Sequence, residues 1–150
     1  MESVTAKVEN AIQQGAKVLC GGHRVGDKGY FYAATLLDNC TQDMDIIHQE
    51  TFGPVLPIVT FEDTTQVIQW ANDVEYGLAS SVFTKDLDTA TRVCRELEFG
   101  ETYINREHFE AMQGFHAGVK KSGIGGADGR HGVDEYLVTH VTYLDTHYDQ

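Results

Sequence analysis

The chain has 150 residues with 23 acidic and 11 basic side chains, which gives a formal net charge of −12. A chain this acidic is repelled by nucleic acid and by anionic membrane surfaces, so we expect neither as a binding partner. No apolar run is long enough to span a bilayer, and no apolar segment follows the N-terminus as in a signal peptide, so we expect a cytoplasmic protein. The three cysteines lack paired or CxxC spacing, which indicates reduced thiols.

Apolar residues recur with helical spacing in some segments and gather in short β-branched or aromatic runs in others, which predicts an α/β fold. Helices are predicted over residues 2–14, from Asp63, from Asp86 to Gly100, and over 133–137. Strands are predicted over residues 17–20, 30–37, 55–61, 79–84 and 100–105. Strands and helices alternate from residue 55 to 105 as in parallel βαβ units, so we expect a mostly parallel sheet flanked by helices.

Each of the first three helices has an apolar face and a signal for one of its ends. Asp63 and Asp86 are side chains suited to cap a helix N-terminus, and Gly15 is suited to end the first helix. The residues predicted to face inward are Val4, Val8, Ala11 and Ile12 in the first helix, Val67, Ile68 and Ala71 in the second, and Leu87, Ala90, Cys94 and Leu97 in the third.

The last third of the chain is less regular. Residues 106–130 show no spacing long enough for a helix or strand, and long segments of this kind are functional loops or disordered. The glycines of residues 123–129 do not follow the G-x-G-x-x-G spacing, so we interpret them as a flexible turn. Residues 138–144 alternate apolar and polar side chains, which predicts an edge strand that needs a partner. The seven histidines show no metal-ligand spacing, and no metal site is expected.

Residues 48–61 contain both prolines of the chain and predict a stiff turn that leads into a buried strand. Pro54 fixes its own φ and keeps Gly53 out of helical geometry, so Glu50 and Phe52 lie on extended or turning backbone. A carboxylate and an aromatic ring on such a turn can hold a ribose and press on a flat ring. The alternative is a surface glutamate beside an ordinary core phenylalanine.

The run Glu50-Thr51-Phe52-Gly53-Pro54-Val55 resembles the Glu-x-Phe-Gly-Pro-Val signature of the NAD(P)-dependent aldehyde dehydrogenase superfamily. Further segments resemble later landmarks of that family in the right order, and they are Ala71-Asn72, Tyr76-Gly77-Leu78, Phe83-Thr84-Lys85-Asp86-Leu87, Ile104-Asn105 and Lys121-Ser122-Gly123. The resemblance covers nearly the whole chain, and residues 100–131 are most similar to lactaldehyde and glycolaldehyde dehydrogenases.

The resemblance implies a partial aldehyde dehydrogenase catalytic domain, because subunits of the family are much longer and carry a cofactor-binding domain ahead of the matched region. Residues 1–137 would belong to the C-terminal portion of the catalytic domain. Residues 138–150 would form an oligomerisation strand and tail, since the family assembles as dimers and tetramers through its C-terminal strand. A homo-oligomer is therefore expected.

The resemblance also implies roles for single residues. Glu50 would hydrogen-bond the hydroxyls of the nicotinamide ribose, and Phe52 would hold the nicotinamide ring of NAD or NADP. His116 occupies the position of an aromatic residue that lines the aldehyde tunnel, where it could bind the hydroxyl of a small hydroxyaldehyde substrate. Phe109 and Phe115 would line the same tunnel, with Met112. The alternatives are a solvated loop histidine and ordinary packing anchors.

The family's nucleophilic cysteine follows Gly-Gln and its catalytic glutamate precedes Leu-Gly-Gly, and this sequence has neither motif. Cys20, Cys40 and Cys94 are interpreted as packing thiols, so no catalytic residue is assigned. The first hypothesis is a portion of a lactaldehyde-type dehydrogenase that is inert alone and self-associates through exposed apolar surface. The second is a non-catalytic module that pairs with full-length dehydrogenase subunits. A complete small enzyme is a third.

Overall fold

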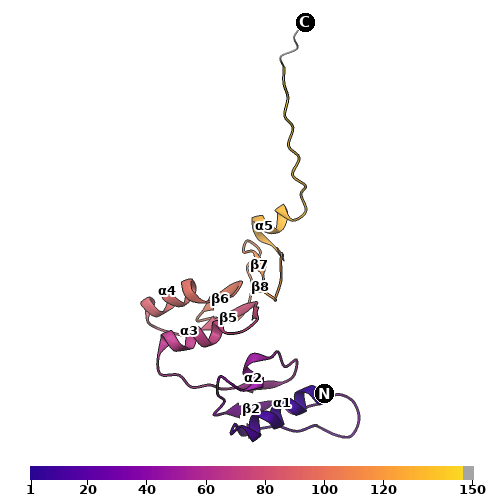
Figure 1. The fold of residues 1–150 in the computed structure, drawn as a ribbon, viewed down its shortest axis with the longest axis vertical. Coiled ribbons are helices and arrows are strands. Elements are labelled where there is room, and N and C mark those ends of the chain that lie inside the picture. The colour runs from indigo at the N-terminus through magenta and orange to yellow at the C-terminus, as the bar shows by residue number, and fades with distance from the viewer. Residues whose placement is uncertain (147–150) are drawn as a thin grey trace.

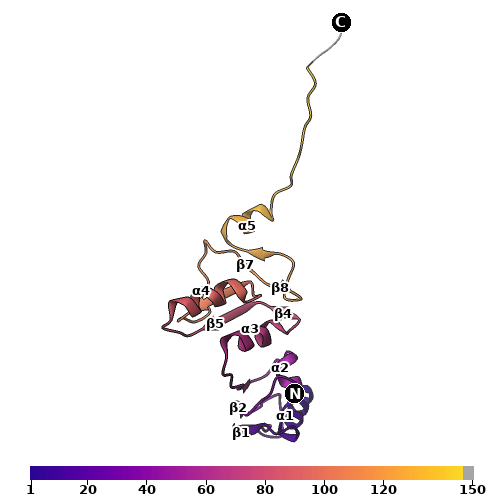
Figure 2. The same cartoon turned by 60° about the vertical axis from the view of Figure 1, so that its left-hand side comes forward.

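The computed structural model describes residues 1–146, which form a molecule elongated along one axis (Figure 1). The helices are α1 (Glu2–Gln13), α2 (Asp45–His48), α3 (Thr64–Asn72), α4 (Leu87–Glu96) and α5 (Gly129–Asp134). The strands are β1 (Lys17–Cys20), β2 (Thr35–Asp38), β3 (Val55–Pro57), β4 (Tyr76–Gly77), β5 (Ala79–Val82), β6 (Glu101–Ile104), β7 (His116–Ala117), β8 (Val119–Lys120) and β9 (Gly126–Ala127). The elements up to β3 lie at one end, α3 to β6 in the middle, and β7 to α5 beyond them (Figure 2).

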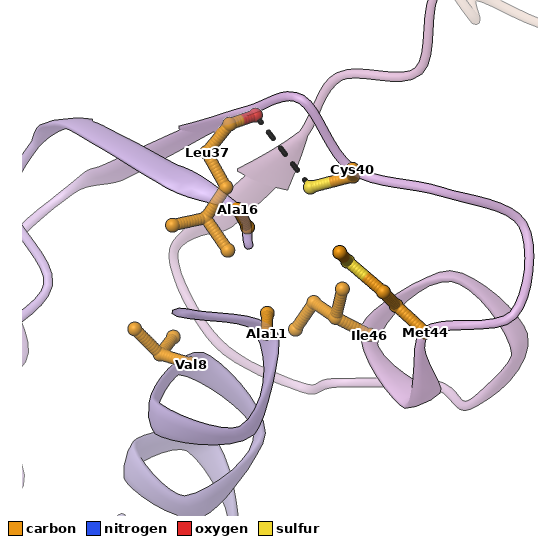
Figure 3. Close-up of a cluster of buried hydrophobic side chains, with 7 residues drawn as sticks. All are labelled: Val8, Ala11, Ala16, Leu37, Cys40, Met44 and Ile46. Carbon is orange, nitrogen blue, oxygen red and sulfur yellow. Dashed lines mark hydrogen bonds between the residues drawn. The ribbon is translucent and has the colours of Figure 1, made fainter. Parts of the chain in front are cut away.

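The best packed part of the molecule is at the N-terminal end, where α1 and α2 lie beside the sheet β1-β2-β3. Its core is a cluster of buried side chains from both helices, β2 and the adjoining loops (Figure 3): Val8, Ala11, Ala16, Leu37, Cys40, Met44 and Ile46. The predicted inner face of α1 is confirmed at Val4, Val8 and Ala11. Ile12 is 43% exposed, because at 3.6 residues per turn it lies about 80° around the helix from Val4.

The capping predictions for α3 and α4 are confirmed. The Asp63 carboxylate accepts a hydrogen bond from the backbone N–H of Thr65 at 3.0 Å, and that of Asp86 accepts one from Thr89 at 2.7 Å. These side chains satisfy N–H groups that have no partner inside the helix, which is why the helices begin there.

The inner face of α4 is centred on a residue that the sequence pattern did not select. Val93 is buried, whereas Leu87 is 77% exposed and Cys94 is exposed, so the prediction was wrong for those two residues. Cys94 follows Val93 directly and therefore lies about 100° around the helix from it. On α3, Ile68 is buried as predicted, and Val67 and Ala71 are half-buried.

Among residues 1–146 the strands form four small sheets, and the expected single, mostly parallel sheet is not present. β2 pairs with β3 and β5 with β6 in parallel, while β1–β2, β4–β8 and β7–β9 are antiparallel. The fold is therefore mixed α/β. β3 is shorter than the predicted strand, although Ile58 still donates to the backbone oxygen of Leu37 at 2.8 Å, and Leu56 of β3 is 63% exposed. The predicted strand over residues 30–37 begins only at Thr35, since Tyr30 is 90% exposed in a loop.

The C-terminal third contains more structure than the sequence pattern indicated. β7, β8 and β9 all fall within residues 106–130, where no element was predicted. Gly126 pairs with β7, and a Cβ there would collide with the carbonyl oxygen of His116, so the flexible-turn interpretation of residues 123–129 was wrong. The final helix, predicted over 133–137, is α5 and begins earlier, at Gly129.

The predicted C-terminal edge strand is absent from the described part of the tail. Residues 138–146 have no regular secondary structure and project away from the rest of the chain (Figure 1), and residues 147–150 lie outside the described residues. An unpaired strand has nothing to hold it in one conformation, which accounts for the difference in a single chain. No helix in the described region is long and apolar enough to cross a bilayer.

One lysine ties the middle of the molecule to its C-terminal part. The Lys120 amino group donates to the backbone oxygens of Asn72 at 2.7 Å and Val74 at 3.3 Å, and it pairs with Glu98 at 2.9 Å. Its side chain is 23% exposed. This contact holds the C-terminal end of α3 against β8.

Candidate substrate and cofactor site

The turn that carries Glu50 and Phe52 is held from behind by α1. The Lys7 amino group donates to the backbone oxygen of Glu50, and a Cβ added to Gly53 would lie 2.8 Å from Val4, so the turn sits directly on the helix. Phe52 has φ +45° and its side chain is 88% exposed. An aromatic residue in this conformation carries backbone strain, and residues of this kind concentrate at ligand sites. The alternative of an ordinary core phenylalanine was therefore wrong.

Glu50 also lines a cavity of about 480 Å³ between the α2–β3 turn and β4. Tyr76, Lys121 and Ser122 contribute to the opposite wall. The Ser122 hydroxyl accepts a hydrogen bond from the N–H of Gly77 at 2.9 Å, which holds the segment after β8 against β4. The Glu50 carboxylate is exposed and reaches solvent from this wall, so it is available as an acceptor for a polyol.

A second group of side chains gathers around His116. Its Nδ1 lies 2.8 Å from Oε1 of Glu101, and its Nε2 lies 3.6 Å from Oε1 of Glu110. The other oxygen of Glu101, Oε2, accepts a hydrogen bond from the Tyr103 hydroxyl at 2.8 Å. Glu101 is only 15% exposed, whereas His116 and Glu110 are 35% and 44% exposed. In this group the Glu101 carboxylate is therefore largely shielded from solvent, and part of the His116 ring is exposed.

The surroundings of Glu101 and His116 favour the charged form of each side chain. The close contact of Nδ1 with the Glu101 carboxylate, and then the charges of Glu101, Glu110 and Asp128, raise the pKa of His116 against the opposing effect of desolvation. Desolvation raises the pKa of Glu101, but the contact with His116 and the hydrogen bond from Tyr103 outweigh it and the net shift is downward. Desolvation and the bond to Glu101 raise the pKa of Tyr103 to about 12. Glu101 is thus ionised, Tyr103 stays neutral, and His116 is biased toward the imidazolium.

The loop between β6 and β7 presents the apolar residues predicted to line the substrate tunnel. Phe109 is 68% exposed and Met112 is 85% exposed. The backbone oxygen of Met112 accepts a hydrogen bond from the N–H of Gly129 at 2.9 Å, which fastens the loop to the start of α5. Phe115 instead packs on the ring of His131, with ring centroids 5.4 Å apart.

The structure brings some of the predicted site residues together and separates others. His116 and the loop that holds Phe109 form one group, and Phe115 turns from that group toward α5. Glu50 and Phe52 belong to the distinct turn on α1. Their roles in substrate and cofactor binding remain predictions.

Sequence reasoning missed Glu101, Tyr103 and Glu110. Glu101 and Tyr103 are two residues apart in β6 and so share one face of the strand, a signal that the sequence does contain. Glu110 carried no such signal, because a glutamate in an irregular loop is ordinarily solvated. In the described residues, ligand atoms of Glu101, Glu110 and His116 come within 4.8 Å of one another, which is close enough to consider a metal ion. Because His116 lies between the two carboxylates in both of its contacts, we assign an ion-pair network.

The three thiols differ in their surroundings. Cys40 is buried in the N-terminal core, and burial raises the pKa of its thiol, as expected of a packing residue. Cys20 and Cys94 are exposed, so their interpretation as packing thiols was wrong. Neither belongs to the group around His116.

A model of the aldehyde dehydrogenase family matches residues 1–142. The chain belongs to that family. Lactaldehyde dehydrogenase from Escherichia coli strain K12 is 56% identical to it over 97% of this chain and 30% of the relative. A solved structure of lactaldehyde dehydrogenase superposes with a TM-score of 0.92 at 56% identity, covering 97% of this chain and 30% of that one. Betaine aldehyde dehydrogenase from Staphylococcus aureus, solved in complex with NAD⁺, gives a TM-score of 0.82 at 38% identity, covering 91% and 28%. The chain thus spans about 30% of the length of the relatives it matches.

Proposed function

We propose that this chain is the C-terminal portion of the catalytic domain of an NAD(P)-dependent aldehyde dehydrogenase that oxidises a small hydroxyaldehyde to its carboxylic acid. The observation that carries the proposal is that the His116 ring lies beside two carboxylates, those of Glu101 and Glu110. The chain that contains this group is 56% identical to a lactaldehyde dehydrogenase. The protein would act in the cytoplasm.

The substrate side of the proposal rests on hydrogen bonding. The His116 imidazolium donates from Nε2, and the Glu110 carboxylate accepts. A substrate hydroxyl can therefore accept a hydrogen bond from His116 and donate one to Glu110. The exposed ring of Phe109, on the same loop as Glu110, would bound the carbon chain of the aldehyde, whereas Phe115 packs on His131 and would support the loop from behind. A site built to bind a hydroxyl discriminates strongly against the analogue that lacks it, because its polar groups are then left unpaired.

The cofactor side rests on the turn over α1. The exposed Glu50 carboxylate suits a vicinal diol, and the exposed, strained Phe52 ring suits a flat ring, so both residues fit the nicotinamide ribose half of NAD(P). NAD(P) accepts the hydride from the aldehyde carbon during oxidation. Glu50 and Phe52 would orient the nicotinamide end and exclude water from one face of it.

The reacting groups would come from sequence outside these 150 residues. The nucleophilic thiol and the carboxylate that activates water are supplied by the rest of a dehydrogenase subunit, and this chain forms part of the surrounding wall. Residues 138–150 would add as a strand to a neighbouring subunit and give a homo-oligomer. Support for this comes from the exposure of Val138, Val141 and Tyr143 in the tail, which are 94%, 64% and 94% exposed.

The test is a chimaeric enzyme in which this chain replaces the matching segment of the Escherichia coli lactaldehyde dehydrogenase. NADH formation with lactaldehyde is expected. His116→Phe should raise the KM for lactaldehyde at least tenfold with little change for propanal, which has no hydroxyl. His23→Phe, at an exposed histidine of the N-terminal loop, is the matched control and should change neither KM.

Two results would count against the proposal. One is a folded chimaera that binds NAD but oxidises no small aldehyde. The other is His116→Phe with an unchanged ratio of KM values for the two aldehydes, which would leave His116 as a solvated loop residue.

The second candidate function is a non-catalytic module that joins full-length dehydrogenase subunits. The projecting apolar tail favours it (Figure 1), because such a segment can pair with a sheet edge without any catalytic group. The isolated chain should then co-purify with a tagged full-length homologue in a pull-down. Loss of co-purification on deletion of residues 138–150 would identify the tail as the contact, and failure of the intact chain to co-purify would exclude the module.

A further inference from the structure

The most enclosed charged group near the proposed substrate residues is Glu101, and no role has been assigned to it above. We propose that Glu101 is a positioning residue that fixes the ring of His116 so that Nε2 faces the open side of the site and donates to the substrate hydroxyl. This inference rests on the proposed function, because it gives His116 its substrate role.

Glu101 itself is held in place from several directions. It opens β6, and its backbone lies in parallel register with Ala79 of β5. Oε2 accepts a hydrogen bond from the Tyr103 hydroxyl, and Oε1 lies against His116 Nδ1 as an ion pair without hydrogen-bond alignment, each at 2.8 Å. A carboxylate with a partner on each oxygen and only 15% exposure has little freedom to rotate.

Tyr103 is in turn fixed by its own neighbours. Its side chain is 9% exposed, the ring of His108 meets it edge-on at a centroid distance of 5.1 Å, and the Arg106 guanidinium lies 5.7 Å from its centroid. The hydroxyl therefore presents a fixed donor to Glu101. Three residues from one strand and the following loop thus support a single carboxylate orientation.

The backbone of His116 is fixed as well, which leaves ring rotation as its main freedom. β7 pairs antiparallel with β9, with His116 opposite Ala127. Rotation of the ring by half a turn would replace Nδ1 with a carbon next to Glu101 and lose the 2.8 Å contact. The contact with Glu101 consequently selects the orientation in which Nε2 points away from β6.

Nε2 is left with an incomplete partner. Its 3.6 Å separation from Glu110 is longer than a hydrogen bond, and Glu110 lies on the exposed loop. A substrate hydroxyl that approaches this pair from the solvent side can therefore accept from Nε2 and donate to Glu110. The groups that face His116 are Glu101 from β6, Glu110 from the loop and Asp128 from the start of α5, all acidic, so the positive charge of the imidazolium is favoured from every side.

The first experiment tests the contact in the 150-residue chain without any activity. The imidazole of His116 is titrated by ¹⁵N–¹H NMR in the wild type and in E101Q, with E75Q as the matched control because Glu75 pairs with Lys121 on the surface. In E101Q the pKa of His116 should fall and its Nδ1 proton should exchange faster. Tyr103→Phe should give a smaller change in the same direction, and E75Q none. An unchanged titration and exchange in E101Q would overturn the proposal.

The second experiment asks whether the contact serves substrate recognition. In the chimaeric enzyme, E101Q should raise the KM for lactaldehyde roughly tenfold, the loss expected for one charge-assisted hydrogen bond, and leave the KM for propanal unchanged. An equal rise for both aldehydes would indicate a merely structural role and overturn the proposal. An inactive wild-type chimaera would instead overturn the proposed function, and the titration of His116 would still decide whether Glu101 orients the ring.

Discussion

Leu37 is one of the fully buried residues of the N-terminal core, and replacing it with alanine should show how much that core stabilises the chain. Its side chain is fully buried in β2, among Val8, Ala11 and Met44 (Figure 3). Leu37→Ala removes three carbon atoms, at about 0.8 kcal/mol of transfer free energy each, or about 2.4 kcal/mol. A cavity adds to this because the surrounding helix and sheet relax only in part, so we expect a total loss of about 3 to 4 kcal/mol.

The measurement is equilibrium unfolding in urea, followed by far-UV circular dichroism. Leu56→Ala is the matched control, since Leu56 lies in β3 opposite Leu36 of β2 and is 63% exposed. It should lose less than about 1 kcal/mol, as is usual for exposed positions. Equal losses at the two leucines would refute the reasoning, because the cluster around Leu37 would then not be the core of the chain.

Three further predictions concern the N-cap residue Asp86, the close backbone contact at Gly100, and the C-terminal tail of residues 138–150. The hydrogen bonds from Thr89 lower the pKa of Asp86, so its ionised form stabilises the fold above the unfolded pKa of about 4, and this stability is lost as the pH falls through the lower folded value. The stability advantage of the wild type over Asp86→Asn in urea should therefore be present at pH 7 and vanish at pH 2, and an advantage that persists in acid would contradict this. Gly100→Ala should strongly destabilise the chain in thermal unfolding, because its Cβ would collide with the backbone oxygen of Ala117, whereas Gly125→Ala, where a Cβ would make only ordinary contacts with Glu135 at 3.5 Å, should cost far less. Deletion of residues 138–150 should leave the urea midpoint unchanged while it abolishes self-association in sedimentation velocity, and a monomeric intact chain would show that the tail does not associate.

Local signals in the sequence predicted local structure well. Asp63 and Asp86 act as caps because their effect needs only an N–H group two or three residues further on. Three of the four residues predicted on the inner face of α1 were correct for the same reason, as Val4, Val8 and Ala11 are about one turn apart, and only Ile12 was wrong. These elements depend on contacts within a few residues, which a single sequence contains.

Signals that depend on distant neighbours were less informative. The face of α4 is set by what packs on Val93, and helical spacing alone gave equal weight to Leu87 and Cys94. β7, β8 and β9 are two residues each, too short for any periodicity to register.

The candidate site was predictable in part for the same reason. His116 was selected from the place that it occupies in a segment resembling the family, which is a relation along the chain. Its partner Glu101 comes from another strand, fifteen positions earlier, and is joined to it only by folding. The resemblance to a family indicated which residues to consider, and the structure was needed to find what each of them contacts.

The contact between Lys120 and the end of α3 affects the order in which the chain folds during translation. The core around Leu37 is built from residues 8 to 46 and can form while the remaining chain is still being translated. The Lys120 contact joins residues 48 positions apart, so the middle of the molecule cannot be joined to its C-terminal part until translation has passed β8. A nascent chain should therefore acquire protease resistance in two stages, with the N-terminal part protected first.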